Sequence, residues 1–301
     1  MIKVLLWIVS DDTGLFNDTI RILERQHNGF EIVGLTAEVP IHIAKGGYSI
    51  PFIPLNEIEH LETEYEVLLA VGARQIGMSE ILQTARQFHL PEEKILGDRI
   101  VCIPGFTLKK YRQLQRSRLS IFSMNCCGGL ISSLMGLQFL SPFVNLFLSD
   151  KDFIKFLRAP RIYLECPPRF EKLTRASKEA PDGYPLFSLG DISLNMMHYK
   201  DPDDALELWN VRKQRINWEN LFVTMCTEDE KILAEFDALP YGKKVCFVPF
   251  KSDSDSAWYI NPKLEDSAFA EIVNHVCAGN PVVYDPFDML LYGKKTQLID
   301  M

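Results

Sequence analysis

A short glycine-rich turn holds the residues of this chain that could most readily do chemistry. It reads Asn125-Cys126-Cys127-Gly128-Gly129, with a strand expected before it and a helix expected from about Leu130. Such a turn points several backbone N–H groups at one spot beside the positive end of the helix, where a phosphate or an oxyanion is stabilised. A thiolate is stabilised there too, so Cys126 is a candidate nucleophile. The alternative is that Cys126 and Cys127 are small buried hydrophobic side chains.

A histidine at the end of a predicted strand is the second candidate. Side chains of the stretch Asp191–Tyr199 alternate between two faces, and His198 ends an apolar row on one of them. His198 could act as a general base, provided that the fold brings Asp191 close enough to orient it. The alternative is a hydrogen-bonded histidine at the rim of a core. Tyr199, its neighbour, is a candidate for substrate binding.

Arginines beside a tryptophan form the third group. A helix is expected to begin at Asp201-Pro202, where a capping acid precedes a proline, and near its end come Arg212, Arg215, Asn217 and Trp218. A guanidinium beside an aromatic ring can recognise a phosphate or the face of a sugar. The alternative is two core tryptophans, Trp209 and Trp218, with arginine stems packed over them.

One further residue that could bind phosphate lies in the N-terminal part of the chain. Arg74 follows the predicted strand Val67–Val71, at the carboxyl edge where such sheets bind ligands, although it can also be a plain surface arginine. The dinucleotide fingerprint is missing, because the first strand leads into Ser10-Asp11-Asp12-Thr13-Gly14, whose carboxylates would repel a pyrophosphate. The sequence therefore identifies no cofactor.

Hydrophobic patterning divides the chain into two α/β domains, residues 1–115 and 116–301. In the first, apolar strands alternate with helical patterns, which predicts a Rossmann-like doubly wound parallel sheet. Its strands are expected at Val4–Val9, Glu31–Thr36, Val67–Val71 and Ile100–Ile103. With Gly46-Gly47 and Pro51 before the third strand, the layout loosely resembles the nucleotide-sugar-binding domain of bacterial sugar acyltransferases. The second domain is expected to contain a mixed sheet.

The glycine turn lies inside a charge-free run from Leu119 to Ser149. A membrane span is not expected there, because Ser132, Gln138 and the Ser141-Pro142 break interrupt the apolar residues. The run is instead predicted to form a buried strand, the turn, a helix and a second strand at Val144–Leu148. Further on, Pro160 is expected to stop a helix and Arg161–Leu164 to form a strand.

Composition excludes several classes of protein. A net charge of -8 with no dense basic cluster argues against a nucleic-acid partner. Seven cysteines, an odd number, indicate free thiols, and the absence of CxxC and HExxH spacing argues against structural zinc. The N-terminus lacks the pattern of a signal peptide, so a cytoplasmic location is expected.

Two ordered blocks of residues resemble a known family. The first contains Asn125-Cys126, Gly128-Gly129, Ser141-Pro142-Phe143 and Asp152-Phe153. The second contains Asp191-Ile192, His198-Tyr199, Arg212, Arg215 to Trp218 and Asn220 to Val223. Together they are similar to an uncharacterised bacterial domain of unknown function in exopolysaccharide or capsular polysaccharide biosynthesis, although that family commonly has an aromatic residue where this chain has Cys127.

This resemblance implies a setting rather than a reaction. Within that setting we expect a transferase acting on a nucleotide- or lipid-linked sugar, with Cys126, Asp191 and His198 as its candidate catalytic residues. The expected partner is a nucleotide sugar or a glycan intermediate, and the oligomeric state is not indicated. A non-catalytic sugar- or nucleotide-binding protein of a polysaccharide assembly system is the alternative. The expected substrate-binding residues are Asn125, Gly128, Gly129, Ser141, Tyr199, Arg212, Arg215, Asn217, Trp218 and Arg74.

Overall fold

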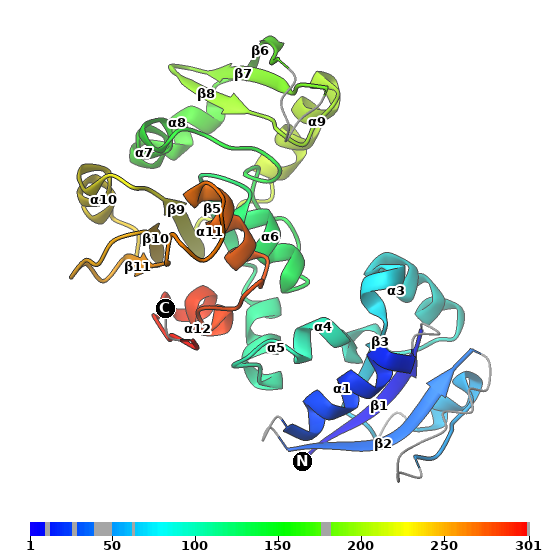
Figure 1. The fold of residues 1–301 in the computed structure, drawn as a ribbon. Coiled ribbons are helices and arrows are strands. Elements are labelled where there is room, and N and C mark those ends of the chain that lie inside the picture. The colour runs from blue at the N-terminus through cyan, green and yellow to red at the C-terminus, as the bar shows by residue number, and fades with distance from the viewer. Residues whose placement is uncertain (10–12, 26–28, 39–49, 62–63, 176–181, 300–301) are drawn as a thin grey trace. The chain divides into compact units, whose positions relative to one another are not determined.

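The chain folds into two compact units, Met1–Thr107 and Leu108–Met301, both built from helices and sheets. The structure is a computed structural model that describes residues 1–9, 13–25, 29–38, 50–61, 64–175 and 182–299 (Figure 1). The expected α/β class is confirmed. Helix α5 (Leu108–Arg116), expected at the end of the first domain, belongs to the second unit.

A parallel sheet of four strands, in the order β2-β1-β3-β4, is the centre of the first unit. Its strands are β1 (Ile2–Ile8), β2 (Phe30–Ala37), β3 (Val67–Val71) and β4 (Ile95–Gly97). The continuous apolar runs of β1 and β3 form central strands because both faces of a parallel sheet are covered. The chain reverses its direction across the sheet between β1 and β3, the point where doubly wound folds bind ligands.

Short helices complete the first unit: α1 (Thr13–Arg25), α2 (Ala73–Ile76), α3 (Met78–Gln87), α4 (Asp98–Val101) and the 3-10 helices η1 (Leu55–Leu61) and η2 (Glu92–Lys94). The strand expected at Ile100–Ile103 is wrong, since its first two residues lie in α4 and the other two in a turn. The buried carboxylate of Asp98 accepts the N–H groups of Gly72 (3.0 Å) and Arg99 (2.9 Å). These bonds tie the end of β4 to the end of β3, so the strand stops at Gly97.

The second unit contains two sheets. Strands β5 (Ser120–Ser123), β9 (Leu221–Cys226), β10 (Lys244–Val248) and β11 (Ala257–Tyr259) form a parallel sheet in the order β11-β10-β9-β5. Strands β6 (Arg169–Leu173), β7 (Pro185–Leu189) and β8 (Ile192–Asn195) form an antiparallel sheet. The parallel and antiparallel strands, expected in one mixed sheet, are therefore separate, as Figure 1 shows for β6–β8.

The larger helices of this unit are α6 (Cys127–Leu134), α7 (Asp150–Arg158), α8 (Pro160–Glu165), α9 (Pro202–Lys213), α10 (Glu230–Asp237), α11 (Phe269–Cys277) and α12 (Pro286–Tyr292). Helix α6 packs against α11, and α7 packs against α10. The strand expected at Arg161–Leu164 is wrong. Helix α7 ends at Arg158, just before Pro160 as expected, and Pro160 then takes the first position of α8, where its missing N–H costs nothing.

The charge-free run does not form the second strand that was expected at Val144–Leu148. Residues 140–148 instead run beside β5: Ser120 Oγ donates to the Leu140 carbonyl (2.8 Å), and the Leu148 N–H donates to the Met124 carbonyl (2.8 Å). Phe147 makes an isolated bridge to Asn195 of β8. This segment, which we call the flank segment, therefore covers the outer edge of the parallel sheet.

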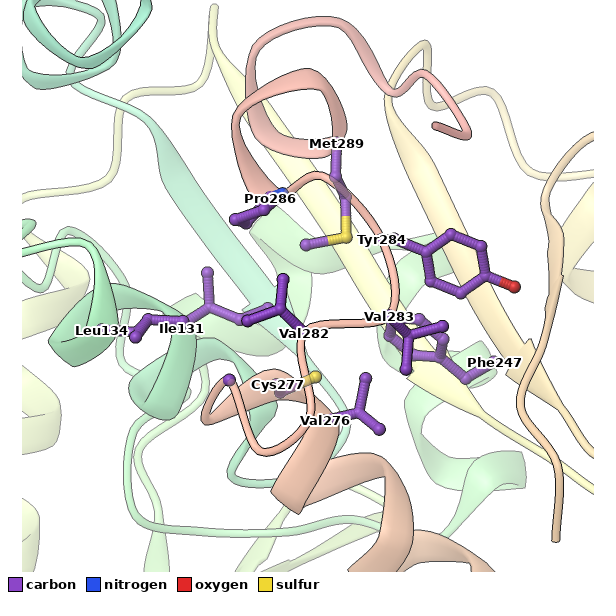
Figure 2. A pocket seen from close by; sticks show the side chains of 11 residues that line it. Ile131, Leu134, Phe247, Val276, Cys277, Val282, Val283, Tyr284, Pro286 and Met289 are labelled. Atoms are coloured by element: carbon purple, nitrogen blue, oxygen red, sulfur yellow. The ribbon is translucent and has the colours of Figure 1, made fainter. Parts of the chain in front are cut away.

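A small cavity of about 20 Å³ lies between α6, α11, α12 and β10 (Figure 2). Its lining is almost wholly apolar and includes Ile131, Leu134, Cys277 and Met289. An apolar cavity with room for roughly one water is a packing gap rather than a ligand site. Within the described ranges, no helix is long and apolar enough to cross a membrane.

Candidate functional site

The turn amides that were expected to hold an anion already donate within the protein. Helix α6 begins at Cys127, whose N–H donates to Asn125 Oδ1 (3.1 Å), and the next N–H, of Gly128, donates to Ser123 Oγ (3.0 Å). Both acceptors are buried. Since these side chains cap the helix, the N–H groups of Cys127 and Gly128 are not available to a phosphate.

Close packing accounts for the two glycines of the turn. A Cβ on Gly128 would lie 2.9 Å from Ser123 Cβ and 3.1 Å from Ile121 Cγ2, and a Cβ on Gly129 would lie 3.3 Å from Val144 Cγ1. Helix α6 can therefore approach β5 and the flank segment only because these positions carry no side chain. Gly128 and Gly129, which were expected to bind substrate, therefore have a packing role.

The thiols near the turn are protonated. Burial raises the pKa of Cys126 to about 11, with a further contribution from Cys127, and raises those of Cys127 and Cys226 well above their usual value. Asn125 Nδ2 contacts Cys226 Sγ (3.6 Å), and all seven cysteines are free thiols. An activated nucleophile needs a lowered pKa, so Cys126 lacks the property for which it was selected.

Asp191 and His198 lie at opposite ends of β8. The four residues of β8 span about 13 Å, so the carboxylate cannot orient the imidazole. Asp191 is instead paired with Tyr163 Oη (2.7 Å) and Lys155 Nζ (3.1 Å), and these hydrogen bonds lower its pKa. The His198 side chain is exposed, and the backbone N–H of His198 donates to the carbonyl of Asn145 in the flank segment (3.3 Å).

Arg212 and Tyr199 form the best-organised polar pair among the predicted residues. Arg212 Nη1 donates to Tyr199 Oη (2.6 Å), and Tyr199 Oη donates to the Val144 carbonyl (3.0 Å). The guanidinium lies over the ring of Phe139 (5.4 Å to its centroid). Tyr199 is 9% exposed, and burial raises its pKa although Arg212 opposes that shift, so it remains a phenol. We call Arg212, Tyr199, Phe139 and the Val144 carbonyl the flank site.

Among the residues that the structure describes, the guanidinium of the flank site has no counter-charge. Arg212 is half-buried, and in the described part of the chain it forms no ion pair with a carboxylate; neither do Arg161 and Arg215. A partly desolvated cation costs free energy unless an anion or full hydrogen bonding compensates it. The flank site is therefore suited to an anionic group supplied from solution.

The structure brings some of the predicted residues to the flank site and leaves others elsewhere. A Cβ added at Gly129 would lie 3.3 Å from Val144 Cγ1, so the first turn of α6 is close to Val144, whose carbonyl accepts from Tyr199. His198 follows β8, and its backbone N–H donates to the Asn145 carbonyl. Phe139 and the Val144 carbonyl were missed. Sequence offers no signal for a backbone carbonyl, and Phe139 is one apolar residue within a long apolar run.

Asn217 and Trp218 lie at the amino end of β5. The Asn217 N–H donates to Ser120 Oγ (2.8 Å), and Trp218 packs edge-on against Phe122, with Arg161 stacked over its ring at 4.1 Å. Arg215, on the loop between α9 and Asn217, is exposed. The alternative of two core tryptophans is confirmed in part: Trp209 is buried, whereas Trp218 is half-buried and has Arg161, not Arg212 or Arg215, over its ring.

Of the remaining predicted residues, Ser141 closes a local turn, and the Arg74 side chain is not described by the structure. Ser141 is buried, and its Oγ accepts the N–H of Phe143 (3.2 Å), which closes a turn. Arg74 lies in α2, but its side chain is outside the described part, as are Ser10, Asp11 and Asp12.

A second hollow, which sequence reasoning missed, lies beside β11. It has a volume of about 350 Å³, and its lining includes Lys251, Asp253, Tyr259 and Lys295. Lys295 Nζ donates to the Ala257 carbonyl (2.8 Å) and interacts with the charge of Asp255, and Asp253 lies in the lining with Lys251, so the hollow has a weaker case as an anion site than Arg212. Among the residues that can be described, no three His, Cys, Asp or Glu side chains converge to hold a metal ion.

Comparison with known proteins adds two findings. Residues 99–292 match a family described as "Domain of unknown function (DUF1919)", a match that covers the whole parallel sheet of the second unit. An uncharacterized protein of Haemophilus influenzae (strain ATCC 51907 / DSM 11121 / KW20 / Rd) is 32% identical over 182 residues. The match covers 59% of this chain and 84% of that relative.

Proposed function

This chain belongs to the DUF1919 family, and we propose that it is a transferase of bacterial cell-surface polysaccharide biosynthesis acting on a nucleotide- or lipid-linked sugar. The observation that carries the proposal is the half-buried guanidinium of Arg212, which Tyr199 holds in place and no carboxylate neutralises in the described residues. Such sugars carry phosphate at the linkage, and a planar guanidinium binds phosphate through two parallel N–H···O bonds.

The proposed reaction uses His198 and Arg212. The oxygen of an acceptor hydroxyl bonds to the anomeric carbon of the sugar, while the bond from that carbon to a phosphate oxygen breaks. His198 takes the hydroxyl proton as general base, and Arg212 stabilises the charge that the leaving phosphate gains. Cys126 has no part, because its thiol is protonated at neutral pH. The cytoplasmic location expected from the sequence would suit nucleotide-sugar chemistry.

Thermal shift of the full chain against nucleotides, nucleotide sugars, acetyl-coenzyme A and S-adenosylmethionine tests the proposal. A ligand at about a hundred times its Kd adds roughly 2.7 kcal/mol, which raises Tm by several degrees. We expect a nucleotide sugar to raise the Tm of the parent protein and not that of Arg212→Ala. Arg158→Ala is the matched control, because Arg158 is an exposed arginine paired with Glu235 (2.8 Å). A shift that survives in Arg212→Ala would place the ligand elsewhere.

A non-catalytic sugar- or nucleotide-binding protein is the second candidate. It is favoured by the separation of Asp191 from His198 and by the raised pKa of the Cys126 thiol. Release of free nucleotide from the nucleotide sugar that binds distinguishes the two candidates. Turnover that His198→Ala abolishes without weakening binding supports the transferase. Binding without turnover, across a panel of acceptor glycans, supports the binding protein.

A further inference from the structure

Strand β6 is an exposed edge of the antiparallel sheet. All five of its residues are exposed, and it is the last strand in the order β6-β7-β8. One row of its backbone N–H and C=O groups therefore faces away from the sheet. In Figure 1, β6 lies on the side of β7 opposite β8.

An apolar surface continues from the covered part of this sheet onto β6. Phe170 is opposite Phe187 and Leu173 is opposite Pro185, so both lie on the face where Phe187 is buried. The rings of Phe170 and Phe187 are 5.7 Å apart, yet Phe170 is 49% exposed and Leu173 is 53% exposed. Two large apolar side chains on one face of an edge strand indicate a contact surface.

Basic side chains lie on the opposite face of β6 from these two apolar residues, where Arg169 pairs with Ser188 and Lys172 with Leu186. Residues 169–175 carry Arg169, Lys172 and Arg175 against the single acid Glu171, a local charge of 3 - 1 = +2 in a chain whose net charge is -8. The Glu171 carboxylate accepts the hydroxyl of Ser188 (2.6 Å). In the described ranges none of the three basic residues forms an ion pair.

We infer that β6 docks on the surface of an anionic lipid bilayer. Phe170 and Leu173 enter the interfacial layer, while Arg169, Lys172 and Arg175 contact the lipid phosphates. A second copy of the chain fits this edge less well. It would bring like charges together, and the register shift between Phe170 and Lys172 interrupts the ladder that strand pairing needs.

This docking surface does not depend on the proposed function. A protein that handles a lipid-linked sugar would work at such a surface, but membrane binding can be measured without any substrate. Loss of the flank site in Arg212→Ala should leave vesicle binding unchanged, so failure of one proposal is distinguishable from failure of the other.

Co-sedimentation of the full chain with vesicles tests the inference. We expect binding to phosphatidylcholine vesicles that contain phosphatidylglycerol, weaker binding to phosphatidylcholine alone, and loss of the difference when salt rises to about 0.5 M. Phe170→Ser with Leu173→Ser should weaken binding at least about ten-fold, from the apolar area lost. Arg169→Gln with Lys172→Gln should weaken it about 25-fold, since each basic residue near an anionic surface contributes roughly five-fold.

The matched control is Leu208→Ser with Val211→Ser, which removes two apolar side chains of similar exposure (38% and 41%) from α9. It should bind vesicles like the parent protein. Because Phe170 packs on Phe187, its serine variant could unfold the sheet; the glutamine variants keep this packing and provide an independent reading. Equal binding by all variants, no preference for anionic vesicles, or a dimer that the Phe170 variant dissociates would overturn the inference.

Discussion

Replacing Gly128 with alanine decides between packing and ligand binding as the role of the glycine turn. The new Cβ would lie 2.9 Å from Ser123 Cβ and 3.1 Å from Ile121 Cγ2. Neither atom is the free end of a flexible side chain: one is bonded to the backbone of β5 and the other is a branch of a buried isoleucine. Helix α6 must therefore move away from the sheet.

Two opposing energies set the size of the effect. Gly128 is within α6 and outside the left-handed region, so alanine would gain at most about 1 kcal/mol of helix propensity. Overpacking a close contact costs about 1–3 kcal/mol. The sum is a destabilisation of up to about 3 kcal/mol, or up to about 2 kcal/mol where the full helix propensity is gained. Each kcal/mol lowers Tm by about 2–4 °C for a unit of this size.

Urea unfolding of the full chain measures this loss. Gly242→Ala is the control, because nothing lies within 4 Å of a Cβ added there, and it should be neutral or slightly stabilising. Gly129→Ala, with a contact of 3.3 Å to Val144 Cγ1, should fall between the two. If Gly128→Ala is as stable as Gly242→Ala and loses only ligand binding, the packing explanation is refuted.

Three further measurements test other parts of the structure. Burial would raise the pKa of Asp288, but hydrogen bonds from Lys110 and Thr296 outweigh it and lower that pKa. Asp288→Asn should therefore be less stable by about 1–3 kcal/mol at neutral pH, with the gap to the parent closing as pH falls below about 4; a constant gap down to acid pH would contradict this. Alkylation of Cys126 by iodoacetamide, followed by mass spectrometry, should accelerate with pH up to about 11; a plateau below pH 8 would show an activated thiol. Leu134→Ala should lose about 2–5 kcal/mol in urea unfolding, because it enlarges the cavity of Figure 2; a loss under 1 kcal/mol would mean that the cavity collapses.

The hydrophobic pattern predicted the central strands well. Val67–Val71 was expected and found with the same bounds. A strand covered on both faces must be a short continuous apolar run, so its limits are visible in the sequence. The α/β class followed from the alternation of such runs with helical patterns.

Elements whose limits depend on tertiary contacts were missed. The end of β4 is set by the bond from Gly72 to Asp98, which are 26 residues apart. The flank segment has the apolar composition of a strand, but its hydrogen bonds to β5 and to Met124 are made by Leu140 and Leu148 near its two ends, while Phe143 packs on Phe122 between them. Neither feature has a local signal, because each depends on a partner far along the chain.

The sequence identified several residues of the candidate site, but not which of them contact one another. Arg212 and Tyr199 were both selected, but the contact between them depends on how α9 packs beside the flank segment. Asp191 was paired with His198 on condition that the fold brings them together, and the strand between them keeps them apart. Asn125 was expected to contact a ligand, and instead it caps the helix that follows.

Experiment can decide whether an anion binds at the carboxyl end of the second unit's parallel sheet or at the flank site. Open parallel sheets bind ligands at their carboxyl ends, but here that end carries Asp150, bonded to Thr227 Oγ1 (3.3 Å), beside turn amides that already donate to Asn125 and Ser123. A phosphate there would meet a carboxylate and two capped amides, whereas at the flank site it meets a guanidinium that lacks a carboxylate partner in the described residues. We therefore expect Asp150→Asn to leave nucleotide-sugar binding within about two-fold of the parent, and Arg212→Ala to weaken it by at least about ten-fold, from the loss of a charge-assisted hydrogen bond. Calorimetric titration of both variants measures this, and the reverse ranking would return the site to the carboxyl end of the sheet.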